Sequence, residues 1–109
     1  MTTPRVALYD DPLFRKHDAG LGHPERPERL DAIRRGIWQA GLESRLLLKA
    51  PRPATTAELL RVHSAGHVAQ VASASGRNYR FDPDTQAGPE SYAAALLAAG
   101  AAAGAVEAV

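Results

Sequence analysis

The chain contains no cysteine among its 109 residues. This absence excludes a disulfide framework, a cysteine-ligated zinc site and a thiol nucleophile. Basic and acidic residues number 13 and 12, which gives a formal net charge of +1. Because neither sign dominates, the charge balance gives no support for binding to nucleic acid or to an anionic membrane. Lysine is also scarce, and the predominance of arginine fits coding bias better than a binding surface.

Long hydrophobic runs and a secretion signal are likewise missing. The longest uncharged segment, residues 91–106, consists mostly of alanine, whereas a membrane-spanning helix needs about 20 strongly apolar residues. The N-terminal residues include no secretory h-region. Together with the absence of cysteine, these features predict a cytoplasmic protein. The length allows one domain of ordinary size and is too short for two.

Short apolar runs alternate with helical patterns in the first half of the chain. Residues 6–9 and 46–48 form brief apolar runs that end at turn-forming residues, as in buried strands. The second run does not alternate with polar residues, which is typical of a strand covered on both faces. Between the two runs, a helix with one apolar face is predicted, formed by Leu30, Ile33, Ile37 and Trp38. We expect Trp38 in the core and Gly41 at the helix C-terminus.

The second half of the chain predicts two further helices separated by a loop. Thr55-x-x-Glu58 is a capping box, and the helix that it begins is expected to extend past Val71 and fray at residues 73–76. Residues 77–88 are expected to form a loop with an Asp-Pro-Asp-Thr turn.

The last predicted helix begins with Pro89, which suits the first helical position. It is rich in alanine and apolar nearly all round, so we expect it to be buried. Gly100 and Gly104 would let another backbone approach it closely. The helical pattern carries no stop signal before the last residue.

The order strand, helix, strand, helix, loop, helix indicates an α/β fold. Two parallel strands cannot cover themselves or satisfy both of their edges. This small number of strands and the uncapped last helix both predict that residues 1–109 are the N-terminal fragment of a single, larger domain.

Two segments could carry chemistry. His23-Pro24-Glu25 lies directly before the first helix, and its proline and glutamate can act simply as a helix lead-in. Alternatively, the segment forms a loop at the rim of an active site. Asp82 and Asp84 can stabilise a turn through side-chain bonds to the backbone. Of the two, we expect Asp84 to be the structural residue. They supply too few oxygens for a calcium site.

The histidines outside that segment give weaker signals. His63 and His67 are four residues apart and could share a metal ion, but no carboxylate or third ligand accompanies them. Such a pair more often consists of one partly buried and one exposed histidine. His17 precedes His23 on the same loop and could also reach the rim of a site.

Three motifs in order resemble the histone deacetylase family. The segment from Gly22 to Leu30, reading Gly-His-Pro-Glu-x-Pro-x-Arg-Leu, is similar to the first loop of its bacterial and class II members. These members include acetylpolyamine amidohydrolases and acetoin-utilisation proteins. Two further segments, from Glu58 to Ser64 and from Asp82 through Tyr92, resemble the next family motifs. His67 departs from the pattern, because an aromatic residue is common there.

The resemblance implies an open parallel sheet flanked by helices, close to the fold of arginase. It also implies a zinc ion, held by two aspartates and a histidine, that activates water against the acetamide of acetyl-lysine or of an acetylated polyamine. The family segments that bear these ligands and the catalytic histidines have no counterpart in this chain. We therefore assign no catalytic or metal residue and expect the chain alone to be inactive and to bind no zinc. The substrate-rim residues carried over from the family are His23, Pro24, Glu25, Asp82 and Asp84. The resemblance implies that one of the two aspartates contacts the backbone of the acyl-lysine substrate.

Two alternatives compete with a deacetylase fragment. The chain could be a non-catalytic module that oligomerises or docks on a partner through its alanine-rich helix. Nucleic-acid binding by the arginines of residues 26–35 is the weakest hypothesis, because Glu25, Glu28 and Asp31 lie among them at the spacing of local ion pairs.

Overall fold

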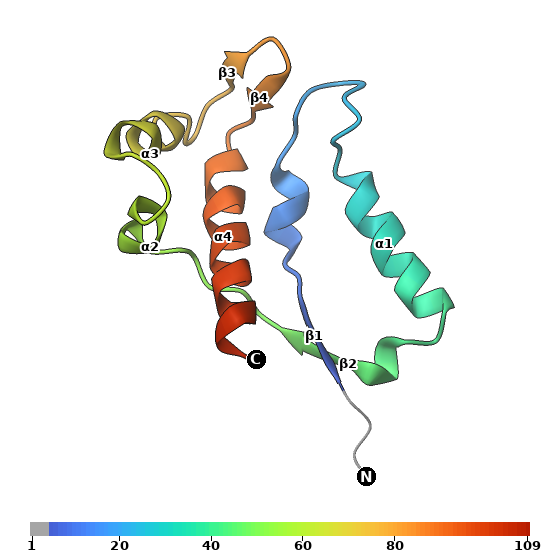
Figure 1. The fold of residues 1–109 in the computed structure, drawn as a ribbon. Coiled ribbons are helices and arrows are strands. Elements are labelled where there is room, and N and C mark those ends of the chain that lie inside the picture. Colours follow the sequence, from blue (N-terminus) through green and yellow to red (C-terminus); the bar gives the residue numbers. More distant parts are fainter. Residues whose placement is uncertain (1–4) are drawn as a thin grey trace.

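The computed structural model describes residues 5–109. These residues form two small sheets and several helices arranged in an open layer (Figure 1). The first half contains β1 (Val6–Tyr9), the 3-10 helix η1 (Pro12–Lys16), α1 (Glu28–Gln39), the 3-10 helix η2 (Glu43–Arg45) and β2 (Leu46–Lys49). The second half contains α2 (Thr56–Leu60), α3 (Ala65–Ala72), β3 (Tyr79–Asp82), β4 (Thr85–Ala87) and α4 (Ser91–Glu107).

The strands β1 and β2 pair in parallel, with Val6 opposite Leu46 and Tyr9 opposite Lys49. A parallel pair requires a crossover, and α1 lies in it, as expected for an α/β fold. The prediction that β2 is covered on both faces is wrong for this chain. Leu47 and Leu48 are 41% and 60% exposed, because no helix of residues 5–109 covers that side of the strand.

The helix α1 ends as predicted, with Gly41 in the left-handed region at a φ of +70°. Its apolar face is poorly covered, however, because the helix stands apart from α4, with η1 between them (Figure 1). Ile33 is 59% exposed and Trp38 is 37% exposed, so the prediction that Trp38 is a core residue is wrong. The guanidinium of Arg34 lies 4.8 Å from the centre of the Trp38 ring, a cation–π contact.

Ion pairs join α1 to the rest of the layer. Arg15 of η1 donates from Nε to Asp31 of α1 at 2.6 Å and from Nη1 to Asp10 at 3.2 Å. Arg34 of α1 donates to the other oxygen of Asp10 at 2.8 Å. Partial burial raises the pKa of Asp10, but hydrogen bonds from the two arginines outweigh it and leave that pKa below its usual value. Ion pairs thus attach α1 to η1 and to Asp10, although this helix buries little apolar surface.

Residues 56–72 form two short helices, which corrects the prediction of one. The break falls at Ser64, whose hydroxyl accepts a hydrogen bond from the backbone N–H of His67 at 3.1 Å and caps α3. The capping box at the start of α2 is confirmed. Thr55 Oγ1 accepts from the N–H of Glu58 at 3.2 Å, and the Glu58 carboxylate accepts from the N–H of Thr55 at 2.9 Å.

Arg52 joins Glu58 of α2 to the end of α4. Arg52 donates to both carboxylate oxygens of Glu58, at 2.8 and 2.9 Å, and to Glu107 at 2.8 Å. The hydrogen bonds from Arg52, aided by the N–H of Thr55, lower the pKa of Glu58 to about 2. This carboxylate therefore stays ionised well into the acid range.

The segment predicted as a loop, residues 77–88, contains the antiparallel pair β3–β4, in which Tyr79 lies opposite Ala87. After this hairpin, α4 begins at Ser91 rather than at Pro89. The N–H of Gly88 donates to Ser91 Oγ at 2.8 Å, and the N–H of Ser91 donates to the carbonyl of Gly88 at 3.1 Å. This turn places the helix start two residues later than the proline suggested.

One side of α4 forms most of the core. Its buried residues recur every third position: Ser91, Ala94, Leu97 and Gly100. The close approach of another backbone expected at both glycines is confirmed at Gly100, whereas the side chain of Tyr9 lies against Gly104. A Cβ at Gly100 would overlap the backbone of Arg52 and Pro53, and the hydroxyl of Tyr9 donates to the Gly104 carbonyl at 3.1 Å. Burial all round the helix is not observed, because its other side faces open space.

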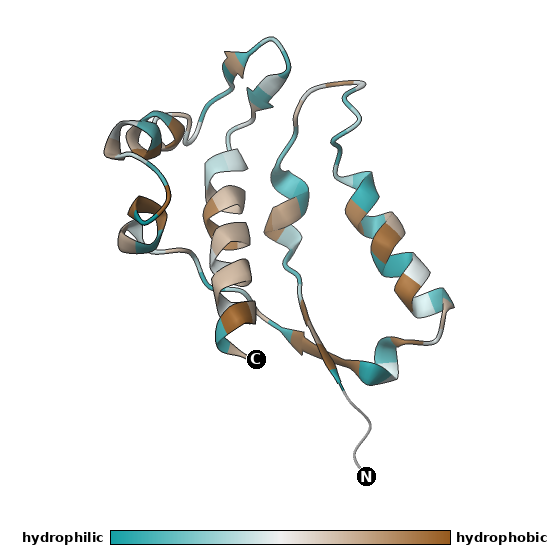
Figure 2. Ribbon diagram, viewed as in Figure 1, coloured by the Kyte–Doolittle hydropathy of each residue, from teal (hydrophilic) through white to brown (hydrophobic). Residues whose placement is uncertain are grey.

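The core of residues 5–109 is small. Five apolar residues are buried, and only Leu97 among them is larger than alanine. The radius of gyration is 15.9 Å, whereas a compact chain of this length is expected near 13 Å. Strongly apolar segments lie on β1, on β2 and along α1 (Figure 2). The layer thus leaves apolar surface uncovered on several elements. No helix within residues 5–109 has the length and apolar character needed to cross a membrane.

Candidate rim site formed by two loops

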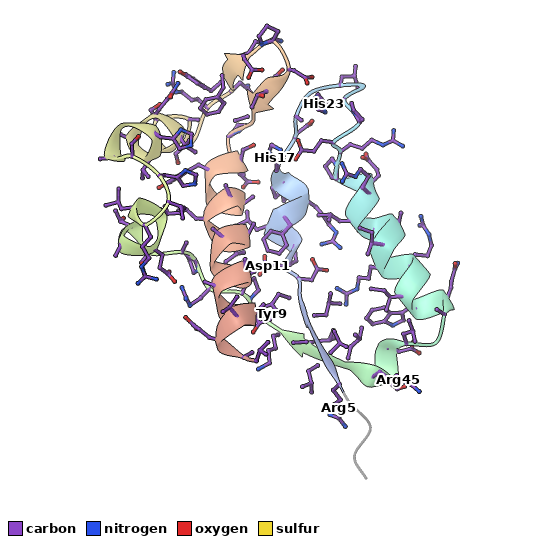
Figure 3. The ribbon with its side chains drawn as sticks, viewed as in Figure 1. Arg5, Tyr9, Asp11, His17, His23 and Arg45 are labelled. Carbon is purple, nitrogen blue, oxygen red and sulfur yellow. The ribbon has the colours of Figure 1, made fainter. Side chains whose placement is uncertain are left out.

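The loop before α1 meets the turn between β3 and β4. His23, labelled in Figure 3, lies where these segments approach each other. Its Nε2 atom is 3.2 Å from the carbonyl oxygen of Asp84 and 3.2 Å from Asp84 Oδ1. The structure therefore brings together two of the rim residues predicted from the sequence, although 61 positions separate them.

Hydrogen bonds define the tautomer of His23. The backbone N–H of Glu25 donates to Nδ1 at 3.0 Å, so Nδ1 acts as an acceptor and carries no proton. We assign the ring proton to Nε2, which then donates to Asp84. The loop itself is tightly turned, since the N–H of His23 donates to the carbonyl of Gly20 at 3.1 Å. Gly20 and Gly22 have φ values of +113° and +78°, which glycine adopts without strain.

The two aspartates of the turn have different roles, and they are the reverse of those expected. Asp82 Oδ1 accepts from the N–H of Asp84 at 2.8 Å, and its Oδ2 accepts from the hydroxyl of Thr85 at 3.1 Å. Asp82 is therefore the turn stabiliser. The side chain of Asp84 is 94% exposed and contacts His23. Asp84 is thus the acid that could meet a ligand at this rim.

His17 makes a second link between the loop and α4. Its Nδ1 lies 2.7 Å from Ser91 Oγ, and its Nε2 lies 3.6 Å from Glu25 Oε1. The order serine, histidine, carboxylate is that of a nucleophilic triad. However, Ser91 is buried and its Oγ already accepts the N–H of Gly88. We interpret Ser91 as a structural residue that connects the start of α4 to His17 and to Gly88. Sequence reasoning missed it, because no local pattern around this serine signals a partner 74 positions away.

An open cavity of about 620 Å³ lies beside these residues, between α1, the hairpin and α4. His17, Glu25 and Ser91 are among its polar lining residues. Most of the remaining wall is apolar, including Phe14, Leu30, Phe81, Ala95 and Ala98. Pro24, His23 and both aspartates are not among the lining residues. Of the five predicted rim residues, Glu25 lines the cavity, and the His23–Asp84 contact lies outside it.

The described residues do not suit a zinc ion. Within residues 5–109, no group of three or more histidine, cysteine, aspartate or glutamate side chains could hold a metal. The rings of His63 and His67 lie 4.9 Å apart with an angle of 41° between their planes. Both are exposed, so the expectation that one of them is partly buried is wrong. Their stacking resembles a surface pair more than a chelate.

Residues 23–109 match the family model described as the histone deacetylase domain. The chain is 36% identical to the histone deacetylase-like amidohydrolase of Pseudomonas aeruginosa, over 98% of the chain and 33% of that protein. It is 44% identical to histone deacetylase 15 of Arabidopsis thaliana, over 72% of the chain and 14% of that protein.

A solved structure, the crystal structure of the HDA15 HD domain, matches 91% of the chain and 30% of its own length. The TM-score is 0.84 and the sequence identity is 36%. The fold class predicted from the sequence is confirmed by this likeness. The chain spans about a third or less of each of these relatives. It belongs to the histone deacetylase family.

Proposed function

We propose that the chain is the N-terminal portion of a zinc-dependent deacetylase that hydrolyses the acetamide of acetyl-lysine or of an acetylated polyamine. The observation that carries this proposal is the match of residues 23–109 to the histone deacetylase domain. The matched residues contain most of the first family motif, from His23 onward, and both of the other motifs, at residues 58–64 and 82–92.

In this proposal the chain contributes the rim of the substrate site and no catalytic group. His23, Pro24, Glu25, Asp82 and Asp84 form two loops that meet through the His23–Asp84 contact. Asp84 is the residue best placed to accept a hydrogen bond from a bound substrate, because its carboxylate is exposed. Since residues 5–109 offer no metal group, zinc and the catalytic histidines would belong to the rest of the domain. The role of this chain is to bind and orient the substrate. We expect a cytoplasmic location.

The test uses the full-length protein, that is, the protein encoded by the complete reading frame. With zinc bound, it is expected to release acetate from an acetyl-lysine peptide or from an acetylpolyamine, and a hydroxamate should block the reaction. Residues 1–109 alone should release none and should bind no zinc tightly. A zinc-loaded full-length protein that turns over neither substrate would refute the proposal.

A second candidate function is a non-catalytic module that oligomerises through α4. The observation that favours it is the open side of this helix, where Val106 is 77% exposed. Sedimentation of residues 1–109 separates the two candidates. A compact, cooperatively folded oligomer would support the module, and an expanded monomer would exclude it.

A further inference from the structure

We propose that His23 is a positioning residue that orients Asp84 for peptide substrates. This inference rests on the proposed deacetylase function and deepens it. It assigns to His23 the selection of acetyl-lysine within a peptide over a small acetylated amine that lacks backbone amides.

Both ring nitrogens of His23 are engaged, so the ring is fixed in position and in tautomer. Nδ1 accepts from the N–H of Glu25 at 3.0 Å, and Nε2 reaches both the carbonyl and the Oδ1 of Asp84 at 3.2 Å. The side chain of His23 is 21% exposed, whereas that of Asp84 is 94% exposed. The mostly buried ring of His23 therefore donates to a carboxylate, that of Asp84, which projects into solvent.

The turn that carries Asp84 is fixed from the other side as well. Asp82 Oδ1 accepts the backbone N–H of Asp84 at 2.8 Å, and His23 Nε2 donates to the carbonyl of Asp84, so two side chains hold the backbone of this residue. Only the side-chain torsions remain, and the contact of Oδ1 with His23 restricts them. Within residues 5–109, Oδ2 of Asp84 makes no hydrogen bond to protein. This second oxygen is therefore free to accept an N–H from an extended peptide lying over the rim.

Without His23, the carboxylate of Asp84 would still be present but would sample several rotamers. Binding would then have to restrict those rotamers, which weakens affinity for any ligand that uses Asp84. A ligand that makes no contact with Asp84 would lose nothing. The signature of the positioning role is thus a rise in KM for the peptide, with kcat retained.

The test compares an acetyl-lysine peptide with N-butylacetamide, which carries the acetamide but no backbone amide. In the full-length protein, His23→Ala is expected to raise KM for the peptide by up to about tenfold, the loss expected when binding must immobilise one more side chain. The value of kcat should change less than about twofold, and kcat/KM for N-butylacetamide should not change. His23→Gln, which keeps an N–H donor, should recover most of the loss. His67→Ala removes an exposed histidine outside the rim and should leave both substrates unaffected.

Asp84→Ala provides the second line of the test, because it removes the acceptor at an exposed position and does not threaten the fold. It should raise the peptide KM at least as much as His23→Ala does, and the two substitutions together should cost no more than Asp84→Ala alone. Additive effects, or an unchanged peptide KM in His23→Ala while both substrates are turned over, would overturn the positioning role alone. If the wild-type protein turns over neither substrate, the proposed function fails, and the positioning role fails with it.

Discussion

Residues 1–109, purified on their own, are expected to melt without a sharp transition and to bind an apolar dye strongly. The reason is the size of the core, since among residues 5–109 Leu97 is the only buried apolar side chain larger than alanine. Burial of apolar surface is the main favourable term in folding, and alanine contributes little of it. The radius of gyration of 15.9 Å exceeds the value of about 13 Å for a compact chain of this length.

Circular dichroism during heating and dye fluorescence measure this property directly. The full-length protein is the control, and it should melt cooperatively and bind little dye, because the rest of the domain would cover the apolar surface of β1, β2, α1 and α4. A sharp transition in the isolated chain, with low dye binding and a monomeric mass, would show that residues 1–109 fold as an independent unit. That result would remove the physical argument that this layer requires more protein against it.

Gly100→Ala is expected to destabilise the full-length protein by about 3 kcal/mol, at the upper end of the usual cost of overpacking. The added Cβ would overlap the carbonyl of Arg52, and the neighbouring Pro53 backbone leaves no room for adjustment. Backbone on both sides must move, and the hydrogen bond from the N–H of Ala54 to the carbonyl of Leu96, at 2.9 Å, lies in the same contact. Urea unfolding monitored by fluorescence measures the change.

Gly36→Ala is the matched control. Gly36 lies in the middle of α1, is exposed, and has nothing within 4 Å of an added Cβ. Alanine is more favourable than glycine in a helix interior by about 1 kcal/mol, so this variant should be slightly more stable than the wild type. If Gly100→Ala unfolds at the same urea concentration as Gly36→Ala, the close approach of α4 to residues 52–53 does not exist in solution.

The features that sequence could predict are those set by local chemistry. The capping box of Thr55 and Glu58 and the glycine at residue 41 depend on bonds or torsions within a few residues, and the structure contains both. The parallel pairing of two apolar runs around a helix follows from the same kind of reasoning. The spacing of Gly100 and Gly104 indicates a close approach of another backbone, which Arg52 provides at Gly100, whereas Gly104 meets the side chain of Tyr9.

The features that were missed depend on competition between local patterns or on distant partners. Apolar residues at helical spacing continue through residues 59–71. This pattern predicts one continuous helix, whereas Ser64 caps the start of a second helix, α3. Pro83 and the neighbouring acids predict a loop, whereas the structure has short paired strands on both sides of this turn. Trp38 was expected in the core because its helix is amphipathic, but an apolar face is buried only if another element packs on it. No sequence pattern shows that Asp82 fixes its own turn while Asp84 turns toward His23.

The measurement that tests the central claim most directly is the sequence of the coding DNA beyond codon 109. If the chain is the N-terminal portion of a zinc deacetylase, the reading frame continues and encodes, in order, a His-His pair, an Asp-x-His segment and a later aspartate. Since the chain spans 33% of the Pseudomonas aeruginosa relative, the continuation should be about twice as long as the chain itself. A stop codon directly after Val109 would contradict the account, and the protein would then have to be a module that acts without the zinc site of its family.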